Sequence, residues 1–412
     1  MVLDAITARI SNELKSAACY TATPGAGCTR LPFTKEAREV VEYLKRIMQD
    51  AGLIVWEDAA GNVFGKLEGS CSNLPCFMMG SHYDSVIHGG NYDGIAGIIC
   101  AIEVARLLKE QQIERKRDFI VAGFCDEEGM RFGTGYFGSG AILGERDVSY
   151  CSNYCDASGM TIYDAMKAYG LNPEKIKDAG WPKNSIGKFL EVHIEQGPVL
   201  DSENVQFGLV NSIVGIKRYQ VLIHGRADHA GTTPMSMRVD AVDAAAKVIA
   251  QISGWAREEQ DGTVATVGII CTKPGGVNII AESCEFSVDI RSVKEEHLKS
   301  IEMRLKETLE KEVDEIGGTF EIKETLSIAP ISLSAEILGD LEKSCRRNGY
   351  SFRYLASGAG HDALKLGQSL PTAMLFVPSL SGRSHCPEEY TEMECFSRAV
   401  MVVADYIRNT EC

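Results

Sequence analysis

The sequence lacks several features that are typical of secreted, membrane-bound or nucleic-acid-binding proteins. None of its 14 cysteines forms a Cys-x-x-Cys pair, so neither a redox motif nor a zinc ribbon is indicated. No apolar run approaches the roughly 20 residues that span a membrane. The first residues show no secretory apolar region. We therefore expect a cytoplasmic protein that does not contact a membrane, with reduced thiols.

A block of basic residues is also missing. The chain has 42 Lys and Arg against 57 Asp and Glu, a formal net charge of −15. A nucleic-acid partner is excluded on this basis, because such a surface needs clustered positive charge. A length of 412 residues with 45% hydrophobic residues suffices for two domains, each with its own core.

The first 210 residues alternate between strand-like and helix-like segments. This alternation predicts an α/β domain whose mostly parallel sheet carries helices on both faces. The strands are expected at residues 63–67, 76–80, 118–125 and 189–194, and the helices at 35–50 and 95–110.

From residue 211 the pattern changes. Strands at 219–224, 264–271, 285–290 and 319–325 and helices at 238–257 and 294–316 give the order βαββαβ. That order predicts a ferredoxin-like α+β domain over residues 211–329. A helix at 334–348, a strand at 372–377 and a helix at 395–408 then resume the first pattern. We therefore expect domain 1–210 to be completed by 330–412, with 211–329 as an inserted domain.

Residues 79–94 are the most informative stretch of the chain. His82 ends an expected strand, and Asp93 precedes an expected helix, each among glycines and small polar residues. Such a pair at one rim of a sheet can bind a metal ion. A lone histidine in this setting is more often structural, so the interpretation depends on further ligands.

Other expected strands end in similar residues. Glu127 and Glu128 directly follow the strand at 118–125, His193 lies in the strand at 189–194, and His385 follows the one at 372–377. In open α/β sheets, sites form where strands end. A lone Glu-Glu pair would be read as a solvated acidic loop. Together with three histidines and Asp93, the pattern instead predicts a dinuclear site with one bridging carboxylate.

With these residues the sequence resembles the dinuclear zinc aminoacylase/aminopeptidase clan, in its amidase, hydantoinase and carbamoylase branch. The resemblance covers nearly the whole chain and rests on six motifs in order. They are Gly80-Ser-His-Tyr-Asp84, Gly90-Asn-Tyr-Asp-Gly94, Asp126-Glu-Glu-Gly129, His193-Ile-Glu-Gln-Gly197, Asp228-His-Ala-Gly-Thr-Thr-Pro-Met235 and Ser384-His-Cys-Pro-Glu388.

The resemblance implies two divalent metal ions per subunit, zinc or else manganese, cobalt or nickel. It assigns His82 and His193 to one ion and Glu128 and His385 to the other. The bridge between the ions would be Asp93. The general base would be Glu127, and Asp84 would orient His82.

The resemblance also implies that the inserted domain 211–329 is a lid or dimerisation domain, and it assigns roles to residues within it. It makes His229 a donor to the developing oxyanion, supplied by the neighbouring subunit of a homodimer. Without the resemblance, its motif would read equally well as a turn and helix cap. Arg291 would bind a substrate carboxylate, or else form a surface salt bridge. The other expected substrate-binding residues are Gln196, Arg218, Asn278, Gly358, Ala359 and Gly360.

These assignments predict an enzyme that hydrolyses a C–N bond in a small linear ureido compound bearing a carboxylate. The first expectation is an N-carbamoyl-L-amino acid amidohydrolase, and the alternative is an allantoate amidohydrolase. The segment 131–144 favours the first, whereas 214–219 and the loop 357–362 are compatible with the second. A metallo-exopeptidase is less consistent with the resemblance, because the motif at 193–197 and the run at 231–235 belong to the ureido branch. A catalytically silent binding protein is less consistent because Glu127 and the expected ligands are all present.

Overall fold

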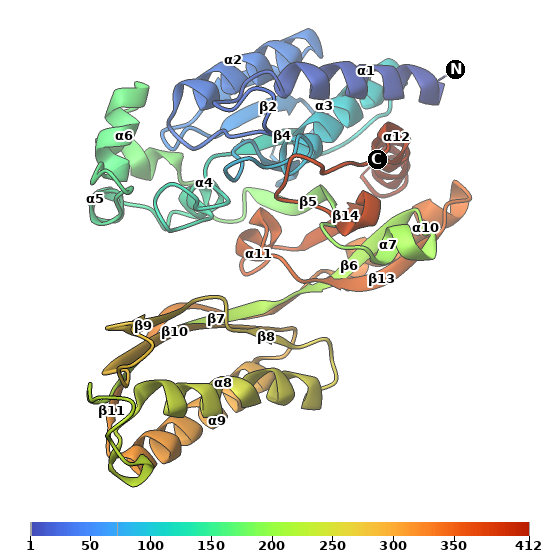
Figure 1. Cartoon of the computed structure of the whole chain (residues 1–412). Coiled ribbons are helices and arrows are strands. Elements are labelled where there is room, and N and C mark those ends of the chain that lie inside the picture. Colours follow the sequence, from blue (N-terminus) through green and yellow to red (C-terminus); the bar gives the residue numbers. More distant parts are fainter. Residues whose placement is uncertain (1, 72, 412) are drawn as a thin grey trace. The chain divides into compact units, whose positions relative to one another are not determined.

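The computed structural model describes residues 2–71 and 73–411. Residues 1, 72 and 412, which the predicted domains include, lie outside the described residues. The chain divides into two compact units (Figure 1). The first contains the described residues up to Asn211 and from Ser332, and the second is Ser212–Ile331. In the described part of the chain, no helix is both long and apolar enough to cross a membrane.

The first unit is built on a nine-stranded sheet in the order β1-β2-β4-β3-β5-β14-β6-β12, with β13 paired to β6. The strands are β1 (Ile54–Glu57), β2 (Val63–Leu67), β3 (Cys76–His82), β4 (Phe119–Phe124), β5 (Ile186–Ile194), β6 (Phe207–Ile213), β12 (Ile331–Ser332), β13 (Phe352–Ser357) and β14 (Thr372–Val377). The four central strands run parallel, and β2 and β6 flank them in antiparallel orientation. The prediction of a largely parallel sheet in a mixed α/β unit is thus confirmed for its centre.

Helices pack on this sheet. They are α1 (Val2–Ala17), α2 (Lys35–Asp50), α3 (Ile95–Glu110), α4 (Phe137–Ile142), α5 (Val148–Asn153), α6 (Ile162–Tyr169), α7 (Val199–Glu203), α10 (Ala335–Arg347), α11 (Asp362–Leu366) and α12 (Met393–Thr410). Short 3₁₀ helices lie at Pro173–Ala179 and Leu380–Gly382. Every residue of β3, β4 and β14 is buried, so both faces of the central sheet are covered.

The start of α3 shows how local sequence places a functional residue. Gly94 precedes the helix with a φ of 66°, in the left-handed region that favours glycine. A Cβ at this position would lie 2.4 Å from His82 Cε1. Glycine therefore allows the backbone beside Asp93 to approach the imidazole of His82.

The second unit carries its own antiparallel sheet, in the order β11-β7-β10-β8 with β9 also on β10. Its elements are β7 (Gly215–His224), α8 (Ala241–Glu258), β8 (Val264–Thr266), β9 (Ile270–Lys273), β10 (Ser283–Ser292), α9 (Glu295–Ile316) and β11 (Thr319–Ile328), with a short 3₁₀ helix at Met235–Met237. Alternate residues of β7 and β10 pack on α8 and α9.

One predicted strand of this unit is wrong. Residues 264–271 do not form one strand, because pairing with β10 breaks after Thr266 and resumes at Ile270. Between them, the Ile269 amide donates to the Ser287 hydroxyl at 3.1 Å, outside the regular ladder.

Candidate metal centre

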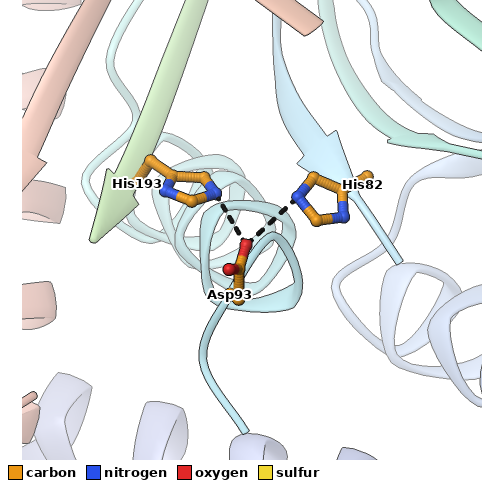
Figure 2. A group of neighbouring side chains, drawn as sticks. All are labelled: His82, Asp93 and His193. Atoms are coloured by element: carbon orange, nitrogen blue, oxygen red, sulfur yellow. Dashed lines mark ion pairs between the residues drawn. The ribbon is translucent and has the colours of Figure 1, made fainter. Parts of the chain in front are cut away.

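Two histidines from neighbouring strands face one carboxylate. His82 ends β3 and His193 lies near the end of β5, and both point toward Asp93 at the start of α3 (Figure 2). Asp93 Oδ1 lies 3.3 Å from His82 Nε2 and 3.1 Å from His193 Nε2. All three side chains are buried. The predicted first set of ligands therefore comes together.

The hydrogen bonds of these imidazoles show how the group would receive a cation. His82 Nδ1 lies 3.2 Å from the Asp84 carbonyl oxygen, and His193 Nδ1 lies 2.9 Å from that of Ile194. A carbonyl only accepts, so Nδ1 carries the proton in each neutral ring and Nε2 turns its lone pair toward Asp93. Three lone-pair donors thus converge, an arrangement that suits a divalent ion.

The pKa shifts of these residues agree with a cation site. Burial lowers the pKa of His82 and His193, but the nearby carboxylates, Asp93 foremost, together outweigh it and raise both pKa values above the usual value. Burial in turn raises the pKa of Asp93, and the surrounding histidines outweigh it, so that the pKa falls well below the usual value. Positive charge is therefore strongly favoured at this point, and a metal ion would supply it.

The other oxygen of Asp93 faces a second set. Oδ2 lies 3.3 Å from His385 Nε2, which is 3.6 Å from Glu128 Oε1. Asp93 raises the pKa of His385 to about 9, and burial raises that of Glu128 to about 7. Asp93, Glu128 and His385 thus form a second group whose ligand atoms could hold a metal ion. One carboxylate lies between two sets of ligands, as a bridging role requires.

Glu127 and Asp84 lie beside these groups. Glu127 Oε2 is 3.9 Å from His82 Nε2, and burial raises its pKa well above the usual value. The Asp84 carboxylate accepts the backbone amides of Glu127 at 3.1 Å and of Glu128 at 3.2 Å. Its Oδ1 is 3.7 Å from His82 Nδ1, farther than its own carbonyl oxygen. Orientation of His82 by the Asp84 carboxylate stays a prediction. The structure adds another role for this carboxylate, which binds the backbone amides of Glu127 and Glu128.

The predicted pocket residues of the first unit lie at different distances from the centre. The Gln196 Nε2 amide donates to Asp93 Oδ2 at 2.7 Å and lies 3.2 Å from His385 Nε2. The loop with Gly358, Ala359 and Gly360 precedes His361. The ring of His361 packs edge-on against that of His193, with centroids 4.5 Å apart. Gln196 thus contacts the centre directly, and the loop is tied to it through His361.

The remaining predicted residues belong to the second unit. His229 is exposed, and its Nδ1 accepts the amides of Gly231 at 3.0 Å and Thr232 at 3.2 Å. Asn278 is next to it, because its carbonyl accepts the Ala230 amide at 3.0 Å.

Arg218 and Arg291 lie together elsewhere in this unit. Arg218 Nε donates to Asp289 Oδ2 at 2.6 Å, and Arg291 Nε donates to Asp289 Oδ1 at 2.9 Å. One carboxylate therefore holds both guanidinium groups on the sheet face opposite the helices.

Glu389 and Ser384 also contact this centre, and neither was assigned a role from the sequence. The Glu389 carboxylate accepts the backbone amide of Asp93 at 3.1 Å, and the Ser384 hydroxyl lies 3.2 Å from Asp93 Oδ2. The sequence did contain a signal for Glu389. A pair of glutamates, Glu388 and Glu389, follows the expected ligand His385, just as the pair Glu127 and Glu128 follows a strand.

Comparisons with known proteins give the same assignment. The model of peptidase family M20/M25/M40 matches residues 78–409. An N-carbamoyl-L-amino-acid amidohydrolase of Paenarthrobacter aurescens is 36% identical over 96% of each chain. An allantoate amidohydrolase of Escherichia coli (strain K12) is 34% identical, also over 96% of each chain. The crystal structure of an amidase of the hydantoinase/carbamoylase family from Burkholderia multivorans superposes with a TM-score of 0.89, at 30% identity over 98% of each chain.

A largely parallel α/β sheet carries clustered histidines and carboxylates at its strand ends, and these groups could hold metal ions. The chain belongs to peptidase family M20/M25/M40. The resemblance noted from the sequence is thereby confirmed, as is the prediction of an enzyme that hydrolyses C–N bonds.

Proposed function

We propose that this enzyme hydrolyses N-carbamoyl-L-amino acids to the amino acid, ammonia and carbon dioxide. Its relatives named as carbamoyl and allantoate amidohydrolases support the broader class, a carbamoyl or ureido amidohydrolase. The observation that carries the proposal is the position of Asp93, whose two carboxylate oxygens face two different sets of ligands. This arrangement suits metal-assisted attack of water on a carbonyl carbon.

The centre would hold two divalent ions. His82 and His193 would bind one and Glu128 and His385 the other, with Asp93 shared. When bound, such a pair of ions polarises the scissile carbonyl and makes water more acidic. Imidazole and carboxylate ligands are compatible with zinc, manganese, cobalt or nickel.

Glu127 would act as the general base. Its carboxylate is buried beside His82, and burial raises its pKa. A base whose pKa lies closer to neutrality takes a proton from water and later releases it to the departing nitrogen. The hydrogen bonds from the backbone amides of Glu127 and Glu128 to Asp84 would fix the main chain from which the base extends.

His229 would donate a hydrogen bond to the oxyanion. Two backbone amides donate to its Nδ1, so the proton of the neutral ring lies on Nε2. The exposed Nε2–H group is then a preoriented donor. A donor of this kind stabilises a transition state by roughly 3 to 4 kcal/mol.

Arg291 would bind the substrate carboxylate, assisted by Arg218. Asp289 accepts a hydrogen bond from the Nε atom of each and so fixes the direction of both guanidinium planes. Two oriented guanidinium groups favour an anionic substrate through paired charge-assisted hydrogen bonds. Asn278 would contribute a side-chain amide to the same substrate.

The length of β10 supports a homodimer through the inserted unit. Arg291 pairs with Ile216 at one end, and Ser283 pairs with His224 at the other. Eight residues at about 3.3 Å per residue separate these ends by roughly 26 Å. His229 and Asn278 lie beyond the Ser283 end, where the backbone pairing continues through His229 and Ile279.

A ureido amino acid is about the size of a dipeptide, roughly 7 Å long in extended form. One substrate therefore cannot contact both Arg291 and His229 of the same subunit. We infer that His229 and Asn278 serve the site of the partner subunit, whereas Arg291 serves its own. Such reciprocal donation fits a two-fold dimer.

Gln196 and the loop of Gly358, Ala359 and Gly360 would complete the pocket. The Gln196 amide nitrogen already contacts Asp93 and His385, and its oxygen accepts no hydrogen bond from the residues that the structure describes. A buried amide oxygen without a partner is costly. An N–H group of a bound ureido substrate would satisfy it.

A parallel assay tests the proposal. The metal-reconstituted enzyme is offered N-carbamoyl-L-amino acids, allantoate and dipeptides under the same conditions, and kcat/KM is compared. We expect the N-carbamoyl amino acids to be the best substrates by at least about tenfold, a difference of about 1.4 kcal/mol in transition-state binding. A dipeptide that is hydrolysed best would contradict the proposal.

Allantoate is the second candidate substrate. The allantoate amidohydrolase relative covers as much of the chain as the carbamoyl amino acid relative, at 34% against 36% identity. Preference for allantoate in the same assay would replace the first proposal with the second and leave the roles of the residues unchanged. Absence of turnover in protein that retains its metal ions would indicate a silent binding protein.

A further inference from the structure

Glu389 is a buried carboxylate close to the proposed metal centre. It lies between the 3₁₀ helix at Leu380–Gly382 and α12, and it is 4% exposed. In the described part of the chain, no lysine or arginine forms an ion pair with it. An isolated buried carboxylate is costly unless hydrogen bonds compensate it. Its position therefore calls for an explanation.

The compensation comes from the segment of Asp93. Glu389 Oε1 accepts the backbone amides of Tyr92 at 3.0 Å and Asp93 at 3.1 Å. Its Oε2 accepts the hydroxyl of Ser384 at 2.6 Å. The same hydroxyl lies 3.2 Å from Asp93 Oδ2. The carboxylate thus ties the backbone of Asp93 to the residue that precedes His385.

Gly90 provides an independent sign that this position is built for Glu389. A Cβ on Gly90 would lie 2.0 Å from Glu389 Oε1 and 2.4 Å from Glu389 Cβ. Contacts that short do not occur, so the carboxylate fits only because residue 90 has no side chain. Glycine is required at position 90 for steric reasons, because any side chain there would overlap Glu389.

His385 needs such a restraint more than the other ligands. Its φ is 55°, in the left-handed region that a residue with a Cβ rarely adopts, and its side chain is 49% exposed. His82 and His193 are instead buried at the ends of strands and held by the sheet. Around His385, the Glu389 amide also donates to the Cys386 carbonyl at 3.1 Å, which closes the turn.

We propose that Glu389 is a positioning residue that holds Asp93 Oδ2 and His385 in register, and so sets the affinity of the metal position formed by Asp93, Glu128 and His385. This inference rests on the proposed dinuclear centre. It predicts that the position between His82 and His193 depends much less on Glu389. The selectivity arises because Ser384, the side chain that Glu389 holds, contacts the oxygen of Asp93 that faces His385.

Zinc titration of the metal-free protein tests the inference. Isothermal titration calorimetry of the wild type should show two zinc ions per chain. Residues that orient metal ligands usually change affinity by about 10- to 100-fold. We therefore expect Glu389→Ala to lower the affinity for the zinc ion held by Asp93, Glu128 and His385 by about that factor. The affinity for the zinc ion held between His82 and His193 should be nearly unchanged. If the folded variant lost affinity for both ions equally, or for neither, the inference would be overturned.

Two further variants test the inference independently of Glu389→Ala. Ser384→Ala removes only the side-chain link, and it should weaken the same ion by about tenfold even if Glu389→Ala does not fold. Wild-type zinc affinity in Ser384→Ala would then overturn the inference. Asp58→Ala is the matched control, because Asp58 also accepts two backbone amides, those of Ala60 and Asn62, both at 2.9 Å. It should lower the unfolding midpoint and keep both zinc affinities.

The titration separates this inference from the proposed function. A wild type that binds two zinc ions but does not hydrolyse any ureido compound would refute the substrate proposal alone. A fully active wild type whose Glu389→Ala variant binds zinc normally would refute the inference alone.

Discussion

The Asp84 carboxylate accepts the backbone amide of Glu127 at 3.1 Å, and both residues lie within the buried rim of the sheet. The same carboxylate accepts the next amide, that of Glu128, at 3.2 Å. Asp84 follows β3 whereas Glu127 follows β4, and these strands are parallel neighbours. The contact therefore joins the loop beside the proposed ligand His82 to the loop that carries the proposed base and another proposed ligand.

Asp84→Asn should impair both activity and stability. An asparagine turns one acceptor into a donor, so one of the two backbone amides loses its partner. We expect a loss of about 1–3 kcal/mol in unfolding free energy and of about 10- to 100-fold in kcat. Urea unfolding and steady-state kinetics measure the two effects.

Asp118→Asn is the matched control. The Asp118 carboxylate accepts the Gly69 amide at 2.8 Å, just before β4 and so at the opposite end of that strand. It should cost stability with little change in kcat. An Asp84→Asn enzyme with wild-type kcat would show that the loop contact has no role in catalysis.

Glu127→Gln should remove turnover and leave the metal ions in place. The amide is nearly isosteric but cannot take a proton from water. General-base catalysis contributes typically about 10²- to 10⁴-fold, so kcat should fall by that factor. Metal content by plasma mass spectrometry should equal that of the wild type, whereas Glu128→Gln should lose metal. Retained activity in Glu127→Gln would assign the base to another group.

Arg291→Ala should raise KM for substrates that carry a carboxylate. Loss of hydrogen bonds to a charged group costs about 1.5–3 kcal/mol, or roughly 10- to 100-fold in KM. A carboxylate-free alkylurea should be affected far less. The matched control is Arg304→Ala, whose side chain pairs with Glu258 at 2.7 Å on the surface of the same unit. An equal rise in KM for the alkylurea would mean that Arg291 supports the local structure and does not bind the carboxylate.

His229→Ala and Glu127→Gln should complement each other in mixed dimers. If His229 serves the partner's site, each mixed dimer contains one intact site, and random mixing restores about a quarter of wild-type activity. Activity is measured after subunit exchange, with mass spectrometry of tagged subunits to verify that mixed dimers form. Verified mixed dimers without activity would place His229 in the site of its own subunit.

The clustering of the expected ligands could be predicted because these residues follow strands. His82 ends β3, His193 lies in β5 and Glu127 follows β4, and the carboxyl ends of these parallel strands meet at one edge. The apolar runs therefore placed the ligands together before their distances were known.

The rest depends on contacts that local patterns do not encode. The Glu389–Asp93 hydrogen bond spans 296 positions of the sequence, and its existence follows from how two loops pack. The strands β6 and β13 were not predicted. Both lie beyond the parallel centre of the sheet. Helix α1 did show a signal, Ile6, Ile10 and Leu14 at helical spacing, which the prediction did not use.

The number of divalent ions bound per chain tests the central claim most directly, because the account depends on Asp93 lying between two metal positions. The measurement is plasma mass spectrometry of zinc-reconstituted protein after exhaustive dialysis. We predict about two ions per chain in the wild type and about one in His385→Ala, as expected for a dinuclear site whose ligands divide into two sets. A wild type that binds a single ion, or a His385→Ala variant that keeps two, would contradict the shared-carboxylate centre.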